Sequence, residues 1–120
     1  MEIEIITVLD FGDHSTERVE LKVNENCNLE YYMIADTTYK EEKISDKLRH
    51  VYWFPIGKAE AGDKVTIYTK PGTNSFRSIN SGKNKHYYFY WGLKNYVWND
   101  TGDTAVLIHL KEWKSTDVNI

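Results

Sequence analysis

Residues 17–23 read Glu-Arg-Val-Glu-Leu-Lys-Val, and apolar and charged side chains alternate along this stretch. Every second residue from Val19 onward is apolar, namely Val19, Leu21 and Val23, and the residues between them are charged. A period of two residues is typical of a β-strand, in which successive side chains point to opposite faces. The stretch therefore predicts a strand with one face in a core and the other in solvent.

The same alternation recurs along the chain, and no stretch has the apolar period of a helix. Strands are expected over residues 2–9, 17–23, 29–34, 47–54, 64–69, 86–91 and 104–110. The longer segments between them, 35–43, 70–83 and 92–101, are predicted to be loops. Turn residues recur about every ten positions, which favours a sandwich or a barrel. We therefore predict an all-β chain that forms one immunoglobulin-like β-sandwich of about seven strands over residues 1–120.

The alternation also predicts which side chains form the core. In the first strand, Ile3, Ile5 and Val8 are expected to point inward, and this strand is expected to pair with the second as a hairpin. Six further residues are expected to be largely buried, namely Val19, Leu21, Val65, Ile67, Val106 and Leu107.

Three segments stand in the order and spacing of a known family: 18–23 with 29–34, 54–55 with 62–67, and 97–107. The second contains Phe-Pro and then Gly-Asp-Lys-Val-Thr-Ile, and the third contains Asn-Asp-Thr-Gly-Asp before an apolar strand. Together they resemble the lamin-tail domain family, over roughly residues 17–110. The resemblance implies an immunoglobulin-like fold and a non-enzymatic role in interaction, attachment or assembly, with no catalytic residues to transfer.

Charge is distributed unevenly along the 120 residues, whose net charge is −3. Residues 1–46 hold twelve acidic and four basic residues (−8), and residues 47–120 hold eleven basic and six acidic residues (+5). Interleaved strands would average this asymmetry, whereas separated ones would create a dipolar surface that orients self-association or a charged partner. No signal peptide or membrane-spanning run is visible, so we expect a cytoplasmic protein without membrane contact.

The side chains that usually bind metals or act as nucleophiles form no known motif. Cys27 is the one cysteine, so it has no partner for an internal disulfide and is expected to be reduced and buried. The four histidines are spread over four segments, and no serine stands in a Gly-x-Ser-x-Gly motif. Asp100 and Asp103 are expected to close a turn, with a calcium site as the alternative, and Gly102 is expected to have a positive φ. We predict no cofactor, no metal and no catalytic site.

The window 70–94 combines basic and aromatic residues and contains no acidic residue. Its cations are Lys70, Arg77, Lys83, Lys85 and Lys94, and its aromatic residues are Phe76, Tyr87, Tyr88, Phe89, Tyr90 and Trp91. Alternation predicts that Tyr88 and Tyr90 share one face of the strand, whereas Tyr87, Phe89 and Trp91 share the other. A simpler interpretation is that half of the aromatic residues face the core and the lysines form a solvated rim.

The window, together with the nearby Trp98, predicts a partner-binding surface made of Lys70, Arg77, Lys83, Lys85, Tyr88, Tyr90 and Trp98. A protein or a second copy of the chain is the first expected partner, because tyrosine and tryptophan are enriched at protein interfaces. A carbohydrate is the alternative, with Trp53, Trp91 and Trp98 as the stacking platform. Single-stranded nucleic acid is the third hypothesis, and the sequence pI of about 5.8 disfavours it.

Overall fold

Strands dominate the computed structural model, which describes residues 1–40, 43–44, 47–98 and 103–118. The eleven strands in this part of the chain are β1 (Ile3–Leu9), β2 (Arg18–Val23), β3 (Cys27–Asn28), β4 (Tyr32–Lys40), β5 (Lys43–Ile44), β6 (His50–Trp53), β7 (Lys58–Ala59), β8 (Lys64–Tyr68), β9 (Ser75–Ile79), β10 (Asn84–Tyr90) and β11 (Asp103–His109). The helical segments of the described residues are two three-residue 3-10 turns, η1 (Leu29–Tyr31) and η2 (Asn80–Gly82). The all-β prediction is therefore confirmed.

Five strands form the larger sheet, in the order β1-β2-β8-β10-β9. β1 and β2 form the predicted antiparallel hairpin, and β2 pairs antiparallel with β8. β10 lies between β8 and β9, parallel to the first and antiparallel to the second. The sheet therefore ends at β1 on one side and at β9 on the other.

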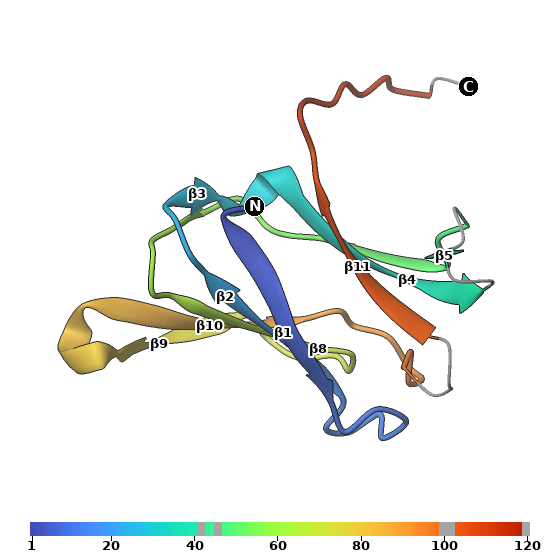
Figure 1. Ribbon diagram of the computed structural model, residues 1–120, viewed down its shortest axis with the longest axis horizontal. Coiled ribbons are helices and arrows are strands. Elements are labelled where there is room, and N and C mark those ends of the chain that lie inside the picture. Colours follow the sequence, from blue (N-terminus) through green and yellow to red (C-terminus); the bar gives the residue numbers. More distant parts are fainter. Residues whose placement is uncertain (41–42, 45–46, 99–102, 119–120) are drawn as a thin grey trace.

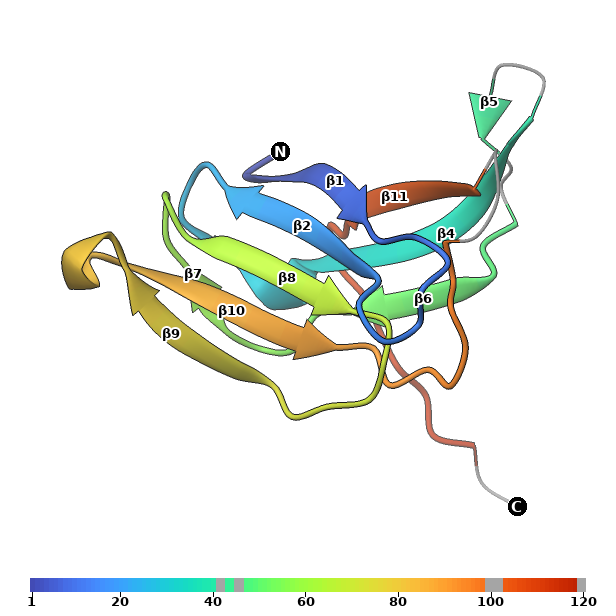
Figure 2. The same cartoon turned by 90° about the horizontal axis from the view of Figure 1, so that it is seen from below.

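The second sheet is built on β4, which pairs with β11 along one side and with β6 along the other. β5 pairs with the end of β4, and β3 pairs with β7 as a separate two-stranded ladder. Figures 1 and 2 show the two larger sheets as facing layers, with β1 and β11 at the same margin. This arrangement is the predicted β-sandwich.

The core lies between the two sheets. Its buried residues are Ile3, Val19, Leu21, Val23, Leu29, Tyr32, Ile34, Phe54, Ala59, Val65, Ile67, Phe89, Val97 and Trp98. Four of the six predicted core residues are among them. The other two, Val106 and Leu107, are only half-buried. They are consecutive residues of one strand and point to opposite faces, so only Leu107 packs against the core.

The described residues form eleven strands rather than about seven, and several predicted boundaries are wrong; the strand predicted over 47–54, for example, is β6 over residues 50–53. Residues 29–31 form η1, and the strand begins only at Tyr32. Residues 35–40, predicted as part of a loop, continue β4, because strands on both sides pair with its backbone. Its polar side chains are also satisfied, since Asp36 Oδ1 accepts a 2.6 Å hydrogen bond from the backbone N–H of His50. The predicted loop 70–83 contains β9, whose exposed residues give no apolar alternation.

Glu17, just before β2, has a fully buried side chain. Its carboxylate accepts hydrogen bonds from Thr69 Oγ1 (2.5 Å) and from the backbone N–H groups of Val97 (2.8 Å), Gly12 (3.0 Å) and Trp98 (3.0 Å). These donors belong to the loop after β1, the end of β8 and the segment after β10. One buried carboxylate therefore joins three segments that are distant in sequence.

Candidate functional site

The aromatic run of β10 alternates between two faces, as predicted. Phe89 is buried between the sheets, and Tyr87 and Trp91 pack against the same core. Tyr88 and Tyr90 lie on the opposite face of the strand, where they are half-buried. One set of rings therefore belongs to the core and the other belongs to the outer face of the five-stranded sheet.

A chain of hydrogen-bonded polar side chains crosses this outer face. The Thr66 hydroxyl donates to Glu20 Oε2 at 2.8 Å, and Thr66 Oγ1 also lies 2.7 Å from His86 Nε2. The other ring nitrogen of His86, Nδ1, lies 3.3 Å from the Tyr88 hydroxyl. The His86 and Tyr88 rings are stacked, with 4.3 Å between centroids.

The pattern of donors around Thr66 assigns the role of one ring nitrogen of His86. Because the single hydroxyl hydrogen of Thr66 goes to Glu20, Nε2 of His86 carries a hydrogen and donates it to Thr66. Nδ1 is then the acceptor for the Tyr88 hydroxyl. Burial is the largest influence on the pKa of His86 and lowers it; the charge of Glu20 opposes this effect, and the charge of Arg77 adds to it. The net effect favours the neutral form of the ring.

Two cations lie over tyrosine rings on the same outer face. The guanidinium carbon of Arg77 is 5.9 Å from the centroid of the Tyr88 ring, and Lys70 Nζ is 5.1 Å from that of Tyr68. The Tyr68 and Tyr90 rings are stacked with centroids 5.3 Å apart. Four predicted binding residues, Lys70, Arg77, Tyr88 and Tyr90, therefore share one surface.

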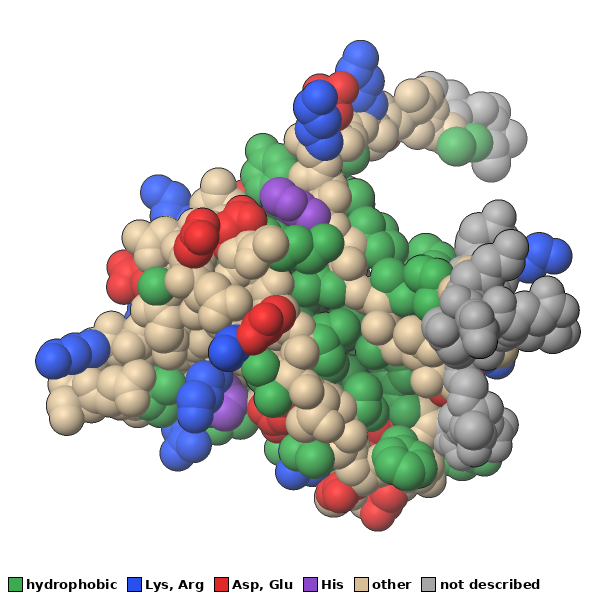
Figure 3. Space-filling model, in the orientation of Figure 1, with side chains coloured by type: hydrophobic (Ala, Val, Ile, Leu, Met, Phe, Trp, Pro, Cys, Tyr) green, Lys and Arg blue, Asp and Glu red, His purple; other side chains and the backbone are tan. Residues whose placement is uncertain are grey.

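The other predicted lysines lie on the opposite side of the β9–β10 hairpin. Lys85 Nζ is 4.7 Å from the centroid of the Phe76 ring. Lys83 and Lys85 line a hollow together with Lys58 of β7, the Tyr87 side chain and two acidic residues, Glu60 and Asp63. Figure 3 shows Lys and Arg side chains gathered over the end of the molecule where β9 and β10 project, with a histidine among them. The hairpin therefore carries cations on both faces, Arg77 on one and Lys83 and Lys85 on the other.

Asp63 fixes the base of this hairpin. Its buried carboxylate accepts hydrogen bonds from the backbone N–H groups of Glu60 (2.8 Å) and Lys85 (3.0 Å) and from Asn84 Nδ2 (3.0 Å). The turn before it needs Gly62, which has a φ of +96°. The Gly62-Asp63 pair thus connects the turn before β8 to the start of β10.

Trp98 corrects the predicted set of binding residues. Its side chain is 3% exposed and belongs to the core, so it cannot contact a partner in this structure. The predicted carbohydrate platform is divided as well, because Trp91 packs against the core and the 45% exposed Trp53 is on the other sheet. The three tryptophans therefore do not form one stacking surface.

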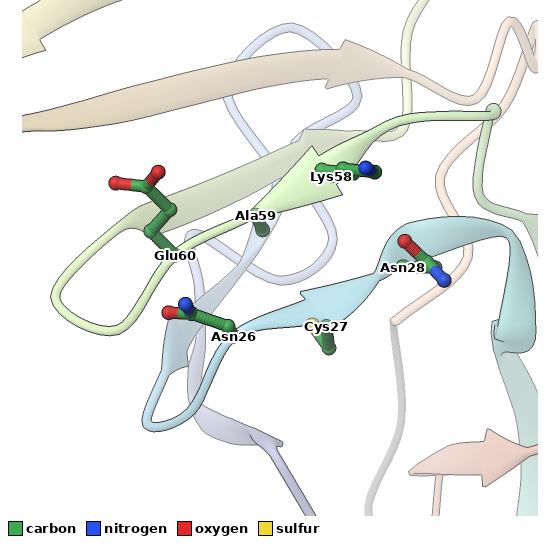
Figure 4. Close-up of a pocket in the computed structure, with 6 residues that line it drawn as sticks. All are labelled: Asn26, Cys27, Asn28, Lys58, Ala59 and Glu60. Atoms are coloured by element: carbon green, nitrogen blue, oxygen red, sulfur yellow. The ribbon is translucent and has the colours of Figure 1, made fainter.

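A second hollow lies beside the β3–β7 ladder, and Figure 4 shows its six lining residues. Cys27 is directly opposite Ala59 in the ladder and is half-buried. Burial raises the pKa of its thiol to about 11, and the negative charges of Glu2, Asp63 and Glu30 add to this shift. The expected reduced thiol is present, although it is less buried than predicted.

We expect Cys27 to react slowly with iodoacetamide at pH 8, because the thiolate is the nucleophile and its population is small. Alkylation followed by mass spectrometry should be roughly ten- to a hundred-fold slower than that of N-acetylcysteine. Unfolding in guanidinium chloride should remove the difference. A native rate equal to that of N-acetylcysteine would contradict the raised pKa.

The histidines have partners other than metals. His14 Nε2 lies 2.6 Å from a backbone carbonyl oxygen, His50 Nδ1 lies 3.0 Å from Asp36 Oδ1, and His109 stacks on a tyrosine ring. The described residues contain no group of three or more His, Cys, Asp or Glu side chains placed to hold a metal ion.

The predicted turn at residues 99–103 falls largely outside the described residues. Asp100 and Gly102 are among the positions that are not described, so the expected turn closure, calcium site and positive φ stay predictions. Asp103 is described, and its carboxylate is 2.9 Å from the guanidinium of Arg49.

Comparison with protein-family models and with curated proteins finds no match to this chain. The resemblance to lamin-tail domains therefore stays a prediction. Among the described residues, no helix is long and apolar enough to cross a membrane.

Proposed function

We propose that this chain is a non-enzymatic interaction module that binds an acidic segment of a partner protein on the β9–β10 hairpin. The observation that carries the proposal is the concentration of cations on both faces of this hairpin. Arg77 lies on the outer face, Lys83 and Lys85 lie on the other, and residues 70–94 include no acidic residue.

The cations of the β9–β10 hairpin contrast with the negative net charge of the chain. With a net charge of −3 the chain as a whole repels an acidic partner, so attraction is expected where cations are concentrated, as on the hairpin. Exposed Phe76 and half-buried Tyr88 supply apolar contact area beside the cations. Charge would then speed association, and the aromatic rings would slow dissociation.

The polar chain on the outer face is a poor candidate for catalysis. Thr66 could act as a nucleophile only if a substrate reached its hydroxyl, and its residue is 1% exposed. The Thr66 hydroxyl already donates to Glu20, and His86 donates to Thr66 rather than accepting its hydrogen. This chain is better understood as a support that orients His86 and Tyr88.

Two sequence features agree with an interaction module. The resemblance to lamin-tail domains implies interaction or assembly without catalysis. The single cysteine, which has no partner for an internal disulfide, suits a reducing compartment, and we propose the cytoplasm.

We expect simultaneous replacement of Arg77, Lys83 and Lys85 by glutamate to weaken binding to poly-L-glutamate at least about tenfold in low salt. The salt dependence of the remaining binding should be flatter, because fewer charges then contribute. Titration by fluorescence anisotropy at two salt concentrations measures both effects. The fold should survive, since exposed charges usually change stability by under about 0.5 kcal/mol each.

A matched pair of variants controls for total charge. Lys83→Glu with Lys85→Glu should weaken binding, whereas Lys111→Glu with Lys114→Glu, exposed positions after β11, should leave it unchanged. Equal effects of the two pairs would contradict the proposed site. Binding of oligo-deoxythymidylate without binding of poly-L-glutamate would replace the proposal with recognition of single-stranded nucleic acid.

A further inference from the structure

β9 is a free edge of the five-stranded sheet, because it pairs with β10 alone. Figures 1 and 2 show it at the margin of the sheet, away from the second layer. Residues 75–78 are all exposed, and Phe76 is 57% exposed. Nothing in the described part of the chain pairs with the outer side of this strand.

The hydrogen bonds of β10 show which backbone groups of β9 face outward. The N–H groups of Lys85 and Trp91 bond to Asp63 and Tyr68, on the β8 side of the strand. The N–H of Tyr90 bonds instead to Asn74, on the β9 side. Because these directions alternate along a strand, the even-numbered residues of β10 bond to β9.

The register then assigns the free groups of β9. His86 is opposite Arg77, and Tyr88 is opposite Ser75, so Arg77 and Ser75 use their N–H and C=O groups inside the sheet. The residues between and beyond them, Phe76 and Ser78, direct their N–H and C=O groups to the open edge. These are the groups that an added strand would bond.

The edge lacks two of the features that usually prevent strand addition, proline and a bulge, and its one charged residue is Arg77. Residues 75–79 include no proline, and the pairing of β9 with β10 has no register shift. In β1, at the opposite edge of the sheet, the register shifts between Ile5 and Thr7. β9 is therefore the more regular of the two edges.

The positive charge of Arg77 determines which kind of strand can pair with the open edge of β9. In an antiparallel pair of two β9 strands that aligns their full length, the two-fold axis would place Arg77 opposite Arg77 of the second copy. Like charges directly opposite each other are destabilising. An acidic residue at that position would instead meet the Arg77 guanidinium.

We propose that β9 recruits an extended acidic peptide of a partner protein by strand addition, with its backbone bonded to Phe76 and Ser78. This inference rests on the proposed function and names the way in which its site holds the partner. Acidic side chains of the peptide lie on the outer face near Arg77. Alternate side chains lie on the other face, where apolar residues contact the exposed Phe76 ring.

The test uses the full chain and a capped heptapeptide of alternating glutamate and valine, with poly-L-glutamate as a second ligand. We expect the heptapeptide to slow amide hydrogen exchange at Phe76 and Ser78, measured by NMR, while Arg77 changes little because its N–H is already bonded. Ser78→Pro should weaken heptapeptide binding at least about tenfold, since it removes an edge N–H.

Ser78→Ala is the matched control, because it keeps the N–H and should bind as the parent does. Ser78→Pro should remain folded, since proline at this position faces the open edge. The NMR signals of the other backbone amides check this. N-methylation of the heptapeptide backbone at alternate positions tests the hydrogen bonds to Phe76 and Ser78 without altering the protein. Unchanged exchange at Phe76 and Ser78 with poly-L-glutamate still bound would overturn strand addition and leave the proposed function standing. Failure of both ligands to bind would overturn both.

Discussion

Glu17→Ala should destabilise the fold by at least about 3 kcal/mol, because four donors, three of them buried, would lose their acceptor together. Each unsatisfied buried donor costs about 1 kcal/mol or more, and no solvent reaches the site to replace the carboxylate. For a domain of this size, such a loss lowers the melting temperature by more than about 10 °C. Urea denaturation followed by tryptophan fluorescence measures the free energy of unfolding.

Two further variants separate the lost hydrogen bonds from lost charge. Glu17→Gln keeps one acceptor oxygen but places an amide nitrogen against N–H donors, so it should also destabilise, by about 2 kcal/mol. Glu25→Gln changes an exposed side chain and should alter stability by less than about 0.5 kcal/mol. A Glu17→Ala protein as stable as the parent would show that the carboxylate does not hold the three segments together.

Local patterns are sufficient to predict most strands of this sandwich. The alternation over residues 17–23 predicts β2, and that over 64–69 predicts β8, because one face of each strand is buried and the other is solvated. Alternation does not reveal a strand whose two faces are equally buried or equally exposed. β9 is exposed on both faces, and β4 continues through Asp36 and Thr37, whose buried polar side chains are satisfied by tertiary hydrogen bonds.

The burial of the Glu17 side chain also could not be predicted from the local sequence pattern. A glutamate that precedes an alternating strand is normally solvated, and its neighbours in sequence give no reason to expect burial. Its donors Val97 and Trp98 lie about eighty positions further along the chain. Only the assembled fold brings them together.

The candidate site could be located from the sequence but not divided into faces. The absence of acidic residues from 70–94 identifies the basic region, and alternation correctly separates Tyr88 from Phe89. Lys83 and Lys85 could not be assigned to the side opposite Arg77, because that requires β9 to be recognised as a strand. Trp98 was misplaced because the segment after β10 has no period from which burial can be inferred.

Phe89→Ala should destabilise the fold by about 3–5 kcal/mol, because a large ring would be removed from the centre of the core. The Phe89 ring packs between the sheets, with its centroid 6.1 Å from that of Phe54 and 6.3 Å from that of Tyr52. The sheets are held at a fixed separation by their other contacts, so the cavity can close only in part. Urea denaturation again gives the free energy of unfolding.

The neighbouring residue supplies the control that makes this loss informative. Tyr88→Ala removes a ring of similar size one position away, on the outer face, where it loses mainly its stacking on His86 and a long hydrogen bond. It should destabilise by only about 1 kcal/mol and should weaken binding to poly-L-glutamate, because the ring beside Arg77 is lost. Equal destabilisation by the two variants would mean that β10 is buried on both faces, and Tyr88 would then be unable to contact a partner.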